Sequence, residues 1–80
     1  MRFTLYTKPE CGLCDDAKQV LEQFRKEREF DLELVNIETD PAVFERYKYD
    51  IPVLAINGQE AAKHVLNLKK LRILIQRIEK

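Results

Sequence analysis

The first 38 residues place a strand pattern, a helix pattern and a second strand pattern in immediate succession. Residues 2–7 mix aromatic and β-branched side chains and predict a strand. From residue 12 to about 29, apolar side chains recur every three or four positions, as on one face of a helix. These side chains are Leu13, Ala17, Val20, Leu21 and Phe24. Residues 31–38 predict a second strand, whose apolar side chains switch faces between Leu34 and Val35, as expected where both faces are covered. This succession predicts a right-handed βαβ unit with parallel strands.

The rest of the chain predicts two more strands and two more helices. Asp40 can cap a short helix that runs from Ala42 to about Tyr47, with proline at its start. Residues 53–56 predict a strand, the Asn57-Gly58 pair predicts a hairpin turn, and residues 59–65 predict the returning strand. A final helix begins after Asn67, and its apolar stripe consists of Leu68, Leu71, Leu74, Ile75 and Ile78. The order β-α-β-α-β-β-α predicts an α/β fold over residues 1–80, as one domain with a four-stranded mixed sheet and three flanking helices.

Charge and hydropathy exclude several classes of partner. Fourteen basic and fourteen acidic side chains cancel, which gives no broad electrostatic reason to expect a nucleic acid or an anionic membrane. No stretch approaches the roughly 20 apolar residues that span a bilayer, and residues 1–6 lack the apolar segment of a signal peptide. We therefore expect an intracellular, cytoplasmic monomer, or an organellar one if a targeting segment has been removed.

The two cysteines form the motif Cys11-Gly12-Leu13-Cys14. Two cysteines placed at random in this chain would fall three apart only about one time in 40. The pair lies between the first strand and the first helix, where amide N–H groups carry partial positive charge and stabilise a thiolate. Cysteines at such helix starts have pKa values of roughly 3.5–7.5. We predict that Cys11 is the nucleophile and that Cys14 resolves the mixed disulfide.

The neighbours of the cysteine pair leave its acidity and its surroundings open. Lys8 favours an ionised Cys11, whereas Glu10, Asp15 and Asp16 oppose ionisation. Gly12 is expected to permit a close approach of backbone and sulfur. Leu13 is either a docking residue that faces solvent or the first residue of the core.

Other interpretations of the two cysteines remain open. A permanent structural disulfide would close only a four-residue loop, and a zinc site would need ligands beyond two thiolates and the single histidine, His64. The cysteines could also be inert. At the level of function, the alternatives are a protein-binding adaptor with idle cysteines and a carrier of a metal or iron–sulfur cluster held between two chains.

Two segments resemble a known family. Residues 5–14 resemble the opening motif of glutaredoxins, and residues 47–53 followed by Asn57-Gly58 resemble the short glutaredoxin-like proteins of the thioredoxin-fold superfamily. The resemblance implies a thiol–disulfide oxidoreductase that acts on protein disulfides or glutathione mixed disulfides. It implies no tightly bound cofactor and no metal, with glutathione as a candidate electron donor. It also implies a cis peptide bond before Pro52, which faces the cysteines, and an Ile51 backbone that binds an extended substrate.

The chain departs from the family at two places. Glutaredoxins that use glutathione carry a Gly-Gly pair and an Asp before the last helix, and the stretch from Asn57 to His64 contains neither. Lys8 matches the family lysine that meets a glutathione carboxylate, so half of the recognition remains. Lys48 occupies a position that is usually glycine in the short family, and we expect it to adopt a left-handed conformation at a cost of roughly 1 kcal/mol.

Overall fold

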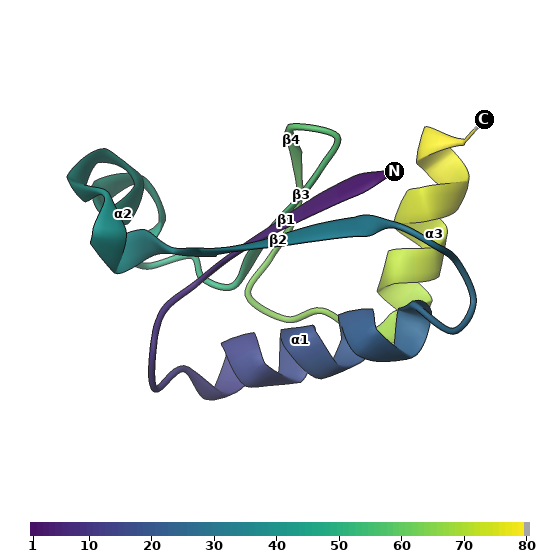
Figure 1. Ribbon diagram of the computed structural model, residues 1–80, viewed down its shortest axis with the longest axis horizontal. Helices are drawn as coiled ribbons and strands as arrows, with labels where there is room; N and C mark the ends of the chain where they lie inside the picture. The colour runs from purple at the N-terminus through teal and green to yellow at the C-terminus, as the bar shows by residue number, and fades with distance from the viewer. Residues whose placement is uncertain (80) are drawn as a thin grey trace.

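A four-stranded mixed sheet forms the centre of the molecule (Figure 1). The structure is a computed structural model and describes residues 1–79. Its strands are β1 (Arg2–Thr7), β2 (Asp31–Asn36), β3 (Val53–Ile56) and β4 (Gln59–Lys63), in the spatial order β2-β1-β3-β4. β1 pairs with β2 in parallel and with β3 antiparallel, and β3 pairs with β4 antiparallel. The predicted fold class and the predicted parallel βαβ unit are confirmed.

Three α-helices and a short 3-10 turn connect and cover the strands. They are α1 (Gly12–Phe24), η1 (Ile37–Thr39), α2 (Pro41–Tyr47) and α3 (Leu68–Ile78). Alternate residues of β1 face opposite sides of the sheet. Phe3 and Leu5 pack with buried residues of α1 and α3, whereas Tyr6 packs with α2. One face of the sheet is therefore covered by α1 and α3, and the other by α2.

Three phenyl rings lie at the centre of the larger core. The Phe3 ring is fully buried, and its centroid lies 4.4 Å from that of Phe30 and 6.4 Å from that of Phe24. Phe24 ends α1 and Phe30 precedes β2, so this cluster joins the end of the helix to the two parallel strands.

A smaller core lies beneath α2. The rings of Tyr6 and Tyr47 lie 4.6 Å apart, beside Val53 and Ile37. The Tyr47 hydroxyl donates a hydrogen bond of 2.9 Å to Glu60 on β4. Burial, followed by the bond to Glu60, raises the pKa of Tyr47, and the same bond lowers the pKa of Glu60. The bond fixes α2 to the β3–β4 hairpin.

The helix that was expected to run to about residue 29 ends at Phe24. Residues 25–29 are all charged and offer no apolar side chain to the core. The chain turns instead through short-range bonds, from the Lys26 amide to Gln23 and from the Glu27 amide to Phe24. This turn brings Phe30 back onto Phe3.

Two strands are also shorter than predicted. β2 ends at Asn36, where the Asn36 side chain caps η1. Because β2 lies at an edge of the sheet, Leu34 is 52% exposed, so the expected cover on both faces is wrong there. β4 ends at Lys63 because His64 has a φ of 65°, which no regular strand accommodates.

The expected left-handed conformation of Lys48 is also wrong. Lys48 ends α2 with a right-handed φ of −55°. The residues other than glycine with positive φ are Glu10, Asn57 and His64 among residues 1–79. Asn57 and Gly58, with φ values of 52° and 86°, form the predicted hairpin turn.

Two pairs of oppositely charged side chains fasten α3 to the turn that follows α1. Arg72 contacts both oxygens of Glu27 at 3.0 and 2.6 Å, and Arg28 contacts both oxygens of Glu79. Hydrogen bonds from these arginines hold the pKa values of both carboxyl groups below the ordinary value of 4.5. Within residues 1–79, no helix has the length and apolar character to cross a membrane.

We expect these two pairs to give an acid-dependent contribution to stability. A carboxyl whose pKa is lowered on folding stabilises the folded protein above its unfolded pKa and loses that effect as pH falls through the folded pKa. The free energy of unfolding should therefore decrease as pH falls below about 4.5. In urea titrations between neutral and acidic pH, the double variant Arg28→Gln/Arg72→Gln should show a shallower decrease. Lys26→Gln is the control, and an unchanged pH dependence in the double variant would refute the assignment.

Candidate active site

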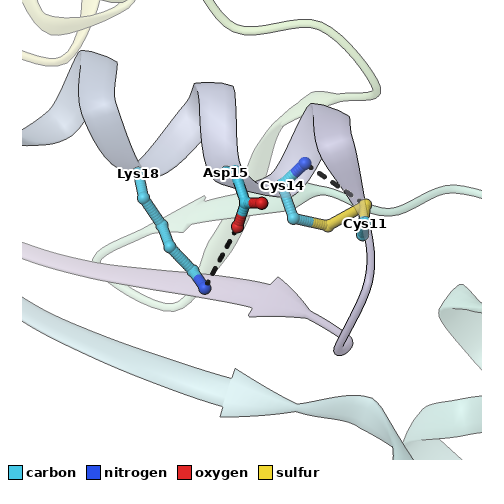
Figure 2. Close-up of a disulfide and its surroundings, with 4 residues drawn as sticks. All are labelled: Cys11, Cys14, Asp15 and Lys18. Atoms are coloured by element: carbon cyan, nitrogen blue, oxygen red, sulfur yellow. Dashed lines mark hydrogen bonds and ion pairs between the residues drawn. A yellow bond between two sulfur atoms is a disulfide. The ribbon is translucent and has the colours of Figure 1, made fainter.

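The sulfur of Cys11 caps the first helix (Figure 2). β1 ends at Thr7, the chain turns through residues 8–10, and Cys11 keeps an extended backbone with φ −113° and ψ 107°. Its Sγ accepts a hydrogen bond of 3.2 Å from the backbone N–H of Cys14. The sulfur therefore lies against the positive end of α1, as predicted from the motif.

Cys11 and Cys14 form a disulfide, and their Cα atoms lie 5.2 Å apart. Cys14 is completely buried because it shares the inward face of α1 with Ala17 and Leu21, whereas Cys11 is partly exposed. Leu13 is 46% exposed, so of its two expected positions the one facing solvent is confirmed. The chemical roles assigned to the two cysteines remain predictions.

The turn before Cys11 contains a residue with a left-handed backbone, Glu10. Glu10 has a φ of 60°, a left-handed conformation that costs a residue with a Cβ about 1–2 kcal/mol. Apart from its chain neighbours and its own helix backbone, a Cβ atom at Gly12 would meet no atom within 4 Å, so the expected role of Gly12 in the approach of backbone and sulfur stays a prediction. No sequence signal marks Glu10 for this conformation.

The charged neighbours are spread around the start of α1. Asp15 lies 3.8 Å from Lys18, and Figure 2 shows this pair on the helix turn beside the disulfide. Lys8, Glu10 and Asp16 are exposed. The contribution of Lys8 to substrate binding remains a prediction.

The Ile51–Pro52 peptide bond is cis, as the family resemblance implies. Val53, the residue after Pro52, pairs with Tyr6 near the end of β1. The Ile51–Pro52 bond therefore lies at the end of the sheet where the loop to Cys11 begins. The N–H of Ile51 donates to the carbonyl of Tyr47 at 3.2 Å. The Ile51 carbonyl accepts no backbone hydrogen bond within residues 1–79, and the contribution of Ile51 and Pro52 to substrate binding remains a prediction.

His64 holds the loop that contains Pro52. Its backbone N–H lies 2.9 Å from the Pro52 carbonyl and 3.3 Å from the Asp50 carbonyl. The Asp50 carboxylate also lies 3.5 Å from the Lys63 amine and 3.9 Å from the His64 ring. In the sequence, His64 stands out only as the single histidine, and nothing in the sequence pattern predicts this backbone contact.

The connection between β4 and α3 supplies a capped helix start. The Asn67 side chain accepts a hydrogen bond of 2.8 Å from the Lys70 amide, as predicted. Asn57 and Gly58 lie in the hairpin turn, away from this connection. Val65 lies within the connection and is 56% exposed.

Residues 1–79 contain no group of three or more His, Cys, Asp or Glu side chains placed to hold a metal ion.

Known proteins match this chain along almost its full length. Residues 2–76 match the family described as Glutaredoxin-like domain (DUF836). The glutaredoxin-like protein YDR286C homolog of Dictyostelium discoideum is 33% identical, and the match covers 100% of this chain and 84% of that protein. The X-ray structure of protein XcR50 from X. campestris superimposes with a TM-score of 0.78 and 30% identity, over 94% of this chain and 96% of that one.

A thioredoxin shares the fold at much lower identity. Thioredoxin 1 of Thermosipho africanus superimposes with a TM-score of 0.64 and 13% identity, over 100% of both chains. At this identity the similarity concerns the arrangement of strands and helices, which is the thioredoxin fold.

Proposed function

The chain belongs to the glutaredoxin-like domain family, and from that membership we propose that it is a dithiol–disulfide oxidoreductase. Cys11 is the attacking thiolate and Cys14 is the resolving thiol. The substrate is a protein disulfide or a glutathione mixed disulfide, bound beside Lys8, Ile51 and Pro52. The reaction needs no tightly bound cofactor, and glutathione is a candidate electron donor.

One observation carries the proposal, namely the position of Cys11 Sγ at the start of α1. The sulfur accepts the Cys14 amide at 3.2 Å, and this contact stabilises negative charge on sulfur once the pair is reduced. Cys11 is partly exposed and Cys14 is completely buried, which supports a first attack by Cys11 and a second by Cys14.

The reaction balances as two exchange steps. The Cys11 thiolate attacks one sulfur of the substrate disulfide, and the other substrate sulfur leaves as a thiolate that takes up a proton. Cys14 then loses its proton and attacks Cys11 Sγ, which releases the second substrate thiol and forms the Cys11–Cys14 disulfide. Two electrons pass to the substrate. Two molecules of glutathione, or one external dithiol, return two electrons and restore both thiols.

The backbone around Pro52 favours a substrate that donates a single hydrogen bond to the carbonyl of Ile51. The amide of Ile51 is used by Tyr47, so an extended substrate is gripped at one point of this residue rather than two. Lys8 supplies positive charge near a substrate carboxylate, whether on glutathione or on a protein. The leading substrate class is therefore an exposed disulfide with little surrounding structure.

Trapping of a mixed disulfide tests the proposed roles. Reduced Cys14→Ser protein, mixed with oxidised glutathione, should gain one glutathione on Cys11, because no second thiol is present to release it. Intact-protein mass spectrometry measures the adduct, and addition of dithiothreitol should remove it. The matched variant Cys11→Ser should stay unmodified, since Cys14 is buried. Modification of Cys14 in that variant, with none of Cys11 in the first, would reverse the assignment.

A further inference from the structure

Beside its core-facing side, α3 carries a second apolar stripe. Leu71 and Ile75 point into the core, and Arg72 and Glu79 fasten the helix to the turn after α1. The adjoining side, which we call the outer face of α3, consists of Lys70, Ile73, Leu74, Arg77 and Ile78. Leu74 is half-buried and packs against the larger core, whereas Ile78, expected in the core-facing stripe, is exposed. Ile73 and Ile78 are 42% and 43% exposed, so apolar surface that the fold does not need reaches solvent.

This outer face is hollowed. A depression of about 400 Å³ lies between α3 and the β3–β4 hairpin, where Ile56, Ala61 and Ile78 line it. A second depression of about 370 Å³ lies beside Ile73 and Asn67. Both are lined by Leu74 and Arg77, so the two depressions adjoin along the helix. Adjoining hollows with apolar lining can accommodate successive side chains of a narrow polypeptide.

The rim of the hollows is basic. Lys69, Lys70 and Arg77 are exposed, and within residues 1–79 none of the three has an ion-pair partner. Among residues 1–79, Glu60 is the one acidic residue that lines either hollow, and it already accepts a hydrogen bond from Tyr47 and lies 3.4 Å from Arg46. A complementary ligand therefore carries negative charge around apolar side chains.

We propose that the outer face of α3 docks an acidic segment of a partner protein, with apolar side chains of the segment seated in the two hollows. Figure 1 shows α3 at the opposite end of α1 from the loop that carries Cys11. A partner held there leaves Cys11 accessible, and tethering raises the effective concentration of any disulfide that the partner can bring to it. Docking at the outer face of α3 does not require the proposed redox activity of Cys11 and Cys14.

A synthetic peptide of glutamate and leucine, labelled with a fluorophore, probes this surface by fluorescence anisotropy. The wild-type protein should bind it, and Ile73→Ser and Arg77→Glu should each weaken binding about tenfold. Lys26→Glu is the matched control, because it changes the net charge as Arg77→Glu does but lies in the turn after α1. It should leave the affinity within about twofold of wild type.

Two control peptides and one preparation of lipid vesicles distinguish the proposed occupant from the alternatives. An all-glutamate peptide and a glutamine–leucine peptide should each bind at least about tenfold more weakly, because both charge and apolar anchors are required. Equal binding of the all-glutamate peptide, equal weakening by Lys26→Glu, or no binding of the test peptide would each overturn the proposal. Sedimentation with phosphatidylserine vesicles tests the membrane alternative. If Arg77→Glu abolished sedimentation of the protein with the vesicles but left peptide binding unaffected, the occupant would be a membrane and the proposal would be overturned.

Discussion

Cys11→Ser should lower the turnover of a small disulfide substrate by about a thousandfold or more, to the rate of the uncatalysed reaction. A hydroxyl at position 11 is not ionised near neutral pH and cannot form a mixed disulfide. Cys14 does not replace it, since its side chain is fully buried behind Cys11. The measurement is the reduction of hydroxyethyl disulfide by dithiothreitol, catalysed by wild-type or variant protein.

The matched variant for this experiment is Cys14→Ser. It retains the sulfur at the start of α1 and should still attack the substrate, so that its rate depends on an external thiol to release the adduct. Wild-type turnover by the Cys11→Ser protein would rule out the proposed chemistry. The adaptor with idle cysteines would then account better for the chain.

Phe3→Ala should lower the free energy of unfolding by about 3–5 kcal/mol, a large part of the stability of a small domain. The Phe3 ring is fully buried, and its centroid lies 4.4 Å from that of Phe30. Its removal leaves a cavity where β1, β2 and the end of α1 meet. Urea denaturation followed by circular dichroism measures the loss.

Leu34→Ala is the control for the core variant. Leu34 lies on the edge strand β2 and is 52% exposed, so its truncation should change stability by no more than about 0.5 kcal/mol. Comparable losses in both variants would mean that the three phenyl rings do not form the main source of stability.

Local patterns predicted the elements but not where they end. The helix start at residue 12 and the turn at Asn57 follow from short-range signals, the onset of the apolar repeat and an Asn-Gly pair. The end of α1 at Phe24 goes with a contact between residues far apart in the sequence, because the turn after the helix brings Phe30 back to the Phe3 ring. The apolar pattern of residues 31–38 likewise does not show which side chains are buried, because that depends on the place of β2 at the edge of the sheet.

The site could be predicted only in part for the same reason. The cysteine spacing placed both sulfurs at the start of one helix, and the family resemblance implied the cis bond at Pro52. Neither gave the hydrogen bond from the Ile51 amide to Tyr47, which depends on where α2 ends against the following loop. Lys48 shows the limit of the family resemblance. Glycine is usual at this position in the family and suggested a left-handed backbone, but Lys48 has a right-handed φ of −55°.

The concealment of Cys14 has a kinetic consequence. With one sulfur open to solvent, an oxidised substrate and an incoming reductant must approach the same atom, so they cannot occupy the protein together. Under the proposed mechanism each reactant leaves before the next arrives, and the kinetics should be ping-pong, with parallel lines in double-reciprocal plots. The direction of net electron flow is then set by the reduction potentials and concentrations of the reactants, not by separate entrances for them.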